Sequence, residues 1–243
     1  YLATFPLEGE KCLQWSSYDR KSRLENGKYL EWDANGDNNG HLRMEGEQMV
    51  IGEMDGPGCI WRIWSATPEQ GHVKIYLDGN SIPAVDLPFV EYFNRTQAPF
   101  NYTELNHTVA MGWNCYVPIP FQKSCKIVAD PGWGHYYHFT YSTFAKDAVV
   151  PTFTRNLDAD SLLALMQAND TLQNSGVSPG EYQDVKRDGK IGLKLEPGKA
   201  LEVAKIKGPR AITAIRARVK LSEDKEQIRN VLRQLVIKIT WDD

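Results

Sequence analysis

Residues that could bind or transform a ligand are concentrated first in the polar segment Trp15-Ser-Ser-Tyr-Asp-Arg20. A carboxylate such as that of Asp19 can accept hydrogen bonds from two sugar hydroxyl groups, and Arg20 can hold the carboxylate or donate a hydrogen bond to a ring oxygen. This pair is the first candidate for contacting a hydroxyl-rich ligand; the alternative is an ion pair that only fixes the loop. The next polar segment adds short side chains suited either to recognising hydroxyl groups or to forming turns, namely Asn35, Asp37 and Asn38.

A second group of candidates lies on segments that alternate like strands. Successive side chains of a strand point to opposite faces, so we expect Trp61 and Ile63 on one face. Arg62 and Trp64 then share the other face, where a cation or a sugar can lie over the indole. The alternative is a packed tryptophan beside a surface arginine. Two further residues that could line a pocket precede another strand-like run, Trp113 and Asn114.

Several kinds of chemistry have no support in the sequence. A Ser-His-Asp order, a phosphate-binding loop and a His-Glu-x-x-His motif do not occur. His135 and His138 do not share a strand face, and the four cysteines form no Cys-x-x-Cys pair, so we expect no metal and no cofactor. With 28 basic and 31 acidic residues, the net charge of −3 offers no basic field for nucleic acid. No apolar run is long enough to predict a membrane span.

Short strand-like runs separated by turn signals dominate the chain and must position these residues. In the first part they are Gln48–Met54, Cys59–Ala66, His72–Leu77, Cys115–Ile119, Cys125–Ala129 and His135–Phe144. One helix is predicted over Asp158–Ala168, with Asn156 or Asp158 as its cap. Its apolar stripe consists of Leu162, Leu163, Leu165 and Met166. Strands are predicted again at Ile191–Leu195, Ala200–Ile206, Ala211–Leu221 and Val231–Trp241. This mostly β pattern favours a jelly-roll β-sandwich.

An internal repeat indicates how the chain is divided. The segment Gly56-Pro-Gly-Cys-Ile-Trp-Arg-Ile-Trp64 resembles Gly208–Arg216, and Lys74–Gly79 resembles Lys238–Asp243. The second copy carries a charged insertion, Ser222–Arg233, that we predict to be a helix or a loop. We therefore expect a first jelly roll over residues 1–150, a helical linker over 151–187, and the incomplete start of a second jelly roll over 188–243. Because an open sandwich edge is costly, another chain or further polypeptide is expected to complete it.

Several sequence blocks resemble glycoside hydrolase family 172, a former family of unknown function. The resemblance rests on Trp15–Arg20, Gly56–Trp64, Lys74–Gly79 and Gly112-Trp-Asn-Cys-Tyr-Val-Pro-Ile-Pro-Phe121, in that order, and covers nearly the whole chain. It implies a double jelly roll, usually in trimers or multiples of trimers. It also implies activity on α-linked furanosides, such as fructofuranosides and D-arabinofuranosides, by a retaining mechanism that uses two glutamates.

The resemblance assigns no catalytic residue to this chain. In the family the two glutamates lie in the second jelly roll, beyond the point where this chain stops. The sequence also departs from the family's usual Gly-Gly-Asn-Asp after the Trp15–Arg20 block, because Lys21-Ser-Arg-Leu-Glu25 stands there. We therefore expect an oligosaccharide or polysaccharide as ligand, without a particular sugar assigned.

Two alternatives remain beside a glycosidase. One is a carbohydrate-binding jelly-roll protein without catalysis, since a fold does not fix a function. The other is a structural subunit of a heteromer, whose partner supplies the missing strands. The start at Tyr1 fits a processed secretory precursor or a trimmed piece. Together with Asn-x-Ser/Thr sequons, three of them within residues 94–108, it favours an exported protein.

Overall fold

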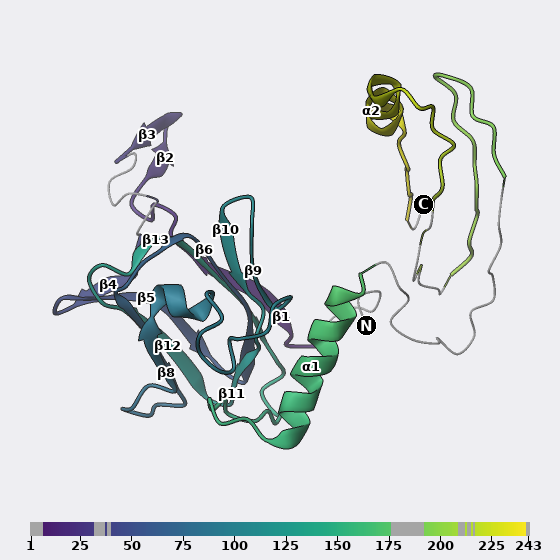
Figure 1. The fold of residues 1–243 in the computed structure, drawn as a ribbon. Coiled ribbons are helices and arrows are strands. Elements are labelled where there is room, and N and C mark those ends of the chain that lie inside the picture. Colours follow the sequence, from purple (N-terminus) through teal and green to yellow (C-terminus); the bar gives the residue numbers. More distant parts are fainter. Residues whose placement is uncertain are drawn as a thin grey trace. The chain divides into compact units, whose positions relative to one another are not determined.

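The computed structural model describes residues 7–31, 37, 40–175, 192–208, 212, 215 and 217–241 (Figure 1). The chain forms two units, one of residues 4–179 and the other of residues 180–243 together with 1–3. Among the described residues, every strand belongs to the first unit. That unit carries the candidate residues and is described first.

Two antiparallel sheets build the first unit. One sheet contains, in spatial order, β1 (Lys11–Ser16), β13 (Gly134–Thr143), β6 (Gly58–Pro68), β10 (Gly112–Cys115) and β9 (Asn106–Val109), and β11 (Ile119–Phe121) also pairs with β6. The other contains β4 (Arg43–Glu45), β5 (Gln48–Asp55), β12 (Ser124–Ala129), β7 (His72–Leu77) and β8 (Val85–Pro88). A separate hairpin, visible at one end in Figure 1, consists of β2 (Arg23–Glu25) and β3 (Lys28–Leu30).

Apolar side chains from both sheets form one core between them. Ile63 of the first sheet and Ile75 of the second are fully buried members of this core. The 3₁₀ helix η1 (Phe89–Tyr92) adds Phe89, whose ring lies 5.7 Å from that of Trp133 in an edge-to-face arrangement. Each such buried side chain stabilises the fold by roughly 1.5–3 kcal/mol. The predicted β-sandwich is confirmed, while the jelly-roll path within it stays a prediction.

The strand predictions for residues 48–144 are largely confirmed, with one error on β6. The β6–β13 register shifts between Thr140 and Tyr141, which leaves Trp61 as the extra residue of a β-bulge. Trp61 is 43% exposed whereas Ile63 is fully buried. The prediction that these two side chains share a face is therefore wrong, because a bulge resets the alternation of the strand. The predicted run Cys115–Ile119 is likewise divided between β10 and β11.

The predicted helix is confirmed and is longer than expected. The helix α1 (Ala159–Gln173) begins after Asp158, whose carboxylate accepts a hydrogen bond of 2.7 Å from the Ser161 N–H. Leu165 is buried in the core of the sandwich, so α1 packs against the two sheets of its own unit. The other members of the predicted apolar stripe are exposed by 42–52%, namely Leu162, Leu163 and Met166.

The second unit differs from the predicted run of strands. None of the described residues within 192–208 and 217–241 forms a strand, so the four strands predicted between Ile191 and Trp241 are not found in the parts that are described. The helix α2 (Lys225–Gln234) covers the start of the predicted strand Val231–Trp241 and confirms a helix in the predicted insertion Ser222–Arg233. Part of the repeat segment Gly208–Arg216 lies outside the described residues.

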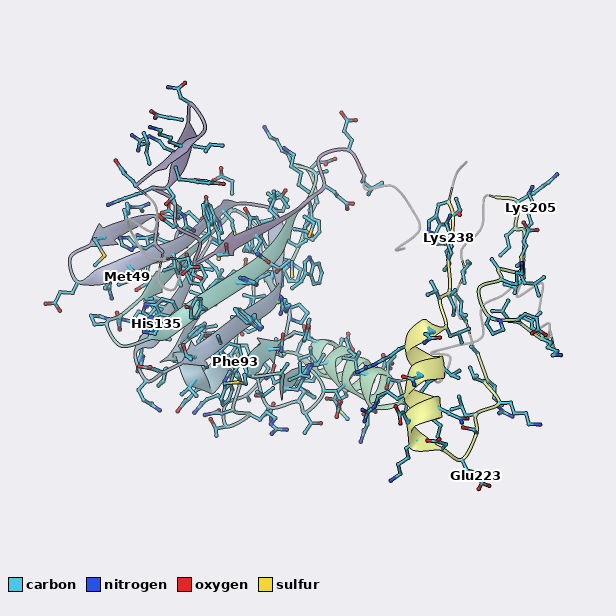
Figure 2. All side chains as sticks on the ribbon, turned by 90° about the horizontal axis from the view of Figure 1, so that it is seen from above. Met49, Phe93, His135, Lys205, Glu223 and Lys238 are labelled. Carbon is cyan, nitrogen blue, oxygen red and sulfur yellow. The ribbon has the colours of Figure 1, made fainter. Side chains whose placement is uncertain are left out.

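The second unit buries no apolar layer among its described residues. Ile237 is 58% exposed and Trp241 is 60% exposed, although both belong to the apolar run that predicted a strand. Figure 2 labels three further residues of this unit, Lys205, Glu223 and Lys238, which all belong to segments without strand or helix. Extended backbone gains little without a paired neighbour and a covered face, which explains why the apolar pattern does not produce strands here.

Two side chains close the edge of the sandwich beside β1. Trp15 of the first sheet donates its indole Nε1–H to the Glu53 carbonyl oxygen of the second sheet at 2.9 Å. Arg20 donates to the Ser16 carbonyl oxygen at 2.6 Å and to the Tyr137 hydroxyl at 3.3 Å. The polar loop after β1 is therefore tied to β13 through a guanidinium.

Tyr137 is the buried end of this connection. Its hydroxyl lies 2.7 Å from the Gly40 carbonyl oxygen and 3.0 Å from that of Ile51, so it can donate to either. A Cβ atom on Gly40 would lie 2.5 Å from the Tyr18 carbonyl oxygen, so the close approach of the two loops requires glycine. Burial raises the pKa of Tyr137 to about 12, and the hydroxyl therefore keeps its proton at neutral pH.

We expect Tyr137→Phe to lower the free energy of unfolding by about 1–3 kcal/mol, because it removes a buried hydroxyl that bonds a charged group and backbone carbonyls. Urea denaturation followed by circular dichroism measures this change. Tyr141→Phe is the matched control. Tyr141 is also a buried core tyrosine of β13, and no hydrogen bond of its hydroxyl occurs within the described part of the chain. Equal destabilisation by both substitutions would contradict the role assigned to Tyr137.

Candidate functional site

A row of polar and aromatic residues crosses the outer face of the first sheet. The pairing register places them side by side on β1, β13, β6, β10 and β9 as Ser16, His138, Trp64, Asn114 and His107. Directly paired residues of neighbouring strands lie on the same face of a sheet. Their neighbours along the strands, such as Ile63 and Phe139, are fully buried on the inner face. We call these five residues the outer-face row.

Trp64 is held in the middle of the outer-face row. Its ring lies 4.6 Å from the ring of His138, with 30° between the planes. On β10, a Cβ atom on Gly112 would lie 2.5 Å from the Trp64 Nε1, so the indole occupies space that only glycine leaves open. Trp64 remains partly exposed. The sheet therefore presents a positioned aromatic ring to solvent.

Arg62 lies beside this row and is fixed by Asn114. Its Nη2 and Nε donate to the Asn114 Oδ1 at 2.9 and 3.2 Å, and the Asn114 Nδ2 donates to the Gly112 carbonyl oxygen at 3.1 Å. The guanidinium also lies 5.9 Å from the centre of the Tyr116 ring. A guanidinium has several N–H donors, and those not directed at Asn114 can donate to a ligand.

The electrostatic surroundings keep His138 neutral. Burial and, secondarily, the positive charge of Arg62 lower the pKa of His138 from its ordinary value of 6.5. A neutral imidazole offers one donor and one acceptor. Together with the indole and the guanidinium, it makes a face suited to stacking on a sugar ring and bonding its hydroxyl groups. Asn114 is buried and serves to position Arg62. The outer-face row contains no carboxylate, so it cannot supply the acid and base that the hydrolysis of a glycoside requires.

Asp19 and Arg20 lie in the loop after β1 and serve its structure. The Asp19 carboxylate accepts the Lys21 N–H at 3.0 Å, the Ser22 N–H at 3.4 Å and the Ser22 hydroxyl, as in an Asx turn. Arg20 is directed at Ser16, Tyr18 and Tyr137, with its guanidinium 4.4 Å from the Tyr18 ring centre. These contacts fit the alternative in which the pair fixes the loop.

The remaining predicted site residues do not belong to the outer-face row. Trp113 pairs with the buried Ser65 and turns toward the core, where its ring lies 6.4 Å from that of Phe93, so it forms no platform on the outer face. The expectation that it lines a sugar pocket is therefore not supported by its position. Asp37 is exposed. Asn35 and Asn38 lie outside the described residues.

Sequence reasoning identified Arg62, Trp64 and Asn114, which the structure brings together, but it missed their supports. In the sequence, His138 raises only the question of a metal site with His135, because its neighbour Trp64 lies on another strand. Gly112 begins the block Gly112–Phe121, but nothing in the sequence indicates that it makes room for the Trp64 indole. A strand register is needed to connect both residues to Trp64.

The structure carries no sign of a metal or redox centre in the part that it describes. No group of three or more potential metal-ligating side chains occurs there. All four cysteines are free, and burial raises the pKa of the Cys59 and Cys115 thiols to about 12. No helix among the described residues is both long and apolar enough to cross a bilayer.

We expect the pKa of His138 to lie below 6.5 and to rise in Arg62→Ala, because that substitution removes one of the two causes of its lowering. The unfolded chain binds more protons than the folded one as the pH falls through 6.5, so His138 reduces folded stability at more acidic pH. NMR titration of the imidazole carbon-bound protons measures the pKa. Arg95→Ala is the control, because Arg95 is an exposed arginine that is not among the causes of the lowered pKa of His138. A wild-type pKa at or above 6.5 would contradict this account.

A comparison with known families agrees with this architecture. Residues 8–161 match the model of the first β-sandwich domain of glycoside hydrolase family 172, a range that includes both sheets and every member of the outer-face row. No curated protein matches the chain. The match covers more than half of the 243 residues. The chain belongs to glycoside hydrolase family 172, of which it contains the first β-sandwich domain.

Proposed function

We propose that the protein is a glycosidase that acts on α-linked furanosides and that the outer-face row, with Arg62, forms one wall of its sugar site. The observation that carries this proposal is the positioned pair of Trp64 and Arg62 on the first sandwich of a glycoside hydrolase family. A partly exposed indole provides a stacking surface for a sugar ring. The fixed guanidinium and the neutral imidazole provide donors for its hydroxyl groups.

The reaction itself requires two carboxyl groups, and the outer-face row offers none. A retaining glycosidase holds them roughly 5–5.5 Å apart, one as nucleophile and the other as acid and base. The family resemblance places two glutamates in the second jelly roll, so we propose that they come from outside the first sandwich. The sandwich then binds and orients the furanoside, and its rigid register keeps the sugar in place relative to those carboxyl groups.

We propose that the chain assembles as a trimer or a multiple of trimers, or with a second chain that completes the second jelly roll. The exposed apolar residues of the second unit, such as Ile237 and Trp241, support an arrangement in which further polypeptide covers them. An exported location remains part of the proposal and rests on the sequence alone.

In the complete enzyme, which carries the two carboxyl groups as well as the first sandwich, we expect Trp64→Ala to raise the KM for 4-nitrophenyl α-furanosides about 3- to 10-fold, because a stacking ring contributes roughly 0.5–1.5 kcal/mol beyond the area that it buries. Arg62→Met is expected to act in the same direction through lost hydrogen bonds. Trp61→Ala is the matched control, since Trp61 is an exposed tryptophan of the same strand whose ring packs at 6.5 Å against Phe144. Steady-state kinetics measures all three variants.

Two outcomes distinguish the proposed glycosidase from a carbohydrate-binding protein without catalysis. Hydrolysis that is unchanged in Trp64→Ala and Arg62→Met would contradict the assignment of the outer-face row. Binding of an α-furanoside without turnover would favour the non-catalytic carbohydrate-binding protein, which the absence of carboxylates from the row also fits.

A further inference from the structure

A cavity of about 670 Å³ lies on the outer side of the other sheet. The polar and aromatic side chains that line it come from β5, β7, β12 and the turn after β7, and are Glu53, Asp55, Tyr76, Asn80, Ser124 and Lys126. This volume is within the range of small-molecule sites, roughly 300–1,000 Å³. We call this cavity the second-sheet cleft.

The strand register places unlike groups side by side in the second-sheet cleft. Lys126 of β12 pairs with Glu53 of β5 on one side and with Tyr76 of β7 on the other. One step along, Ser124 pairs with Asp55. A carboxylate, an ammonium group and a phenol ring therefore cross three strands in one line, with a second carboxylate and a hydroxyl beside them.

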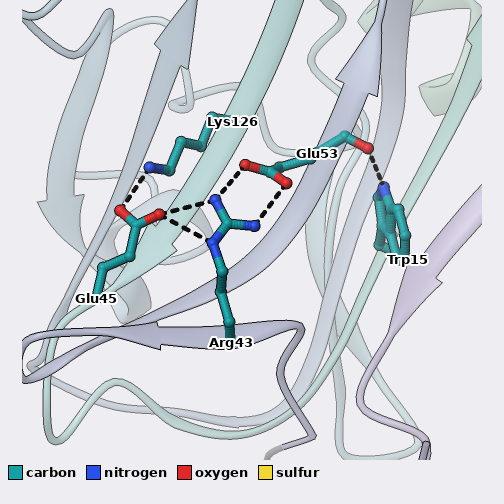
Figure 3. A network of polar contacts seen from close by, with 5 residues as sticks. All are labelled: Trp15, Arg43, Glu45, Glu53 and Lys126. Atoms are coloured by element: carbon teal, nitrogen blue, oxygen red, sulfur yellow. Dashed lines mark hydrogen bonds and ion pairs between the residues drawn. The ribbon is translucent and has the colours of Figure 1, made fainter.

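The charged groups at this cleft are fixed before any ligand arrives (Figure 3). Arg43 of β4 donates to both carboxylate oxygens of Glu53 at 2.7 and 2.6 Å and bonds Glu45 at 2.7 Å. Glu45 in turn accepts from Lys126 at 2.6 Å. The hydrogen bond from Arg43 holds the pKa of Glu53 below its usual value, so the carboxylate stays an acceptor. The indole of Trp15 fixes the backbone of the same residue through the Glu53 carbonyl oxygen.

The chemistry of the lining selects among ligands. Two carboxylates disfavour a phosphate or another anion, and their charge disfavours an apolar occupant. The lining suits a neutral ligand with many hydroxyl groups. Glu53 and Asp55 offer acceptors, and Lys126 and Asn80 offer donors. The partly exposed Tyr76 adds an aromatic ring. A saccharide has this chemistry.

We propose that the second-sheet cleft is a second saccharide-binding site, on the opposite face of the sandwich from the outer-face row. It takes a neutral oligofuranoside and lets one sandwich hold two segments of a polymeric substrate. The ligand class rests on the proposed function, whereas the site itself rests on the cavity and the strand register.

Isothermal titration of the protein with an α-linked arabinofuranosyl oligosaccharide tests this proposal. We expect two sites per chain in the wild type. Tyr76→Ala should weaken one of them by about 3- to 10-fold or more, because a stacking ring is lost, while Tyr76→Phe keeps the ring and the affinity. Tyr29→Ala, an exposed tyrosine of the β2–β3 hairpin, is the control for loss of a surface ring. Circular dichroism confirms that the variants are folded.

The Trp64→Ala variant makes the two proposals separable. A single site that is weakened in Trp64→Ala and unchanged in Tyr76→Ala would overturn the second-sheet cleft and leave the proposed function intact. A single site that is weakened only in Tyr76→Ala would support the cleft and contradict the outer-face row. A wild-type protein that binds no arabinofuranosyl oligosaccharide, or a Tyr76→Ala variant that titrates like the wild type, would overturn the second site.

Discussion

The register of β6 against β13 and β10 is the constraint on which the rest of the site depends. It pairs Trp64 with His138 on one side and with Asn114 on the other, while Ile63 and Phe139 pair toward the core. Because side chains alternate along a strand, a slip by one residue would bury the polar groups and expose the apolar ones. The hydrophobic core therefore fixes the same register that assembles the outer-face row, and stability and binding geometry have one origin.

Hydrogen bonds at the edge of the sandwich connect the two sheets that carry the proposed sites. Trp15 bonds the backbone of Glu53, and Tyr137 joins Arg20 to the carbonyl groups of Gly40 and Ile51. The Trp15–Arg20 block is thus used for structure in the contacts that we describe, and the groups proposed to face a ligand come from strand interiors. This division fits a domain that acts as a rigid support, since binding groups need side chains fixed by packing and hydrogen bonds.

Much of the first sandwich could be predicted from sequence, because turn signals and β-rich runs are local properties. The capping of α1 by Asp158 is local as well, and Asp158 is one of the two caps that the sequence predicts. The exposure of Trp61, the inward turn of Trp113 and the support of Trp64 by Gly112 could not be predicted, because each depends on a bulge or on pairing between distant strands. The second unit shows the converse. Apolar alternation near Ile237 predicts a strand, but a strand also needs a partner and a covered face, and the described residues of this unit provide neither.

The central claim is that the outer-face row contacts a furanoside. The most direct measurement is an NMR titration of the tryptophan indole N–H resonances with an α-linked arabinofuranosyl oligosaccharide, in which Trp64 is assigned by substitution among the seven tryptophans. The account predicts that the Trp64 indole and the His138 imidazole shift together and saturate with one affinity, while the core-facing Trp113 changes little. Saturable binding that leaves both the Trp64 and the His138 resonances unmoved would contradict it.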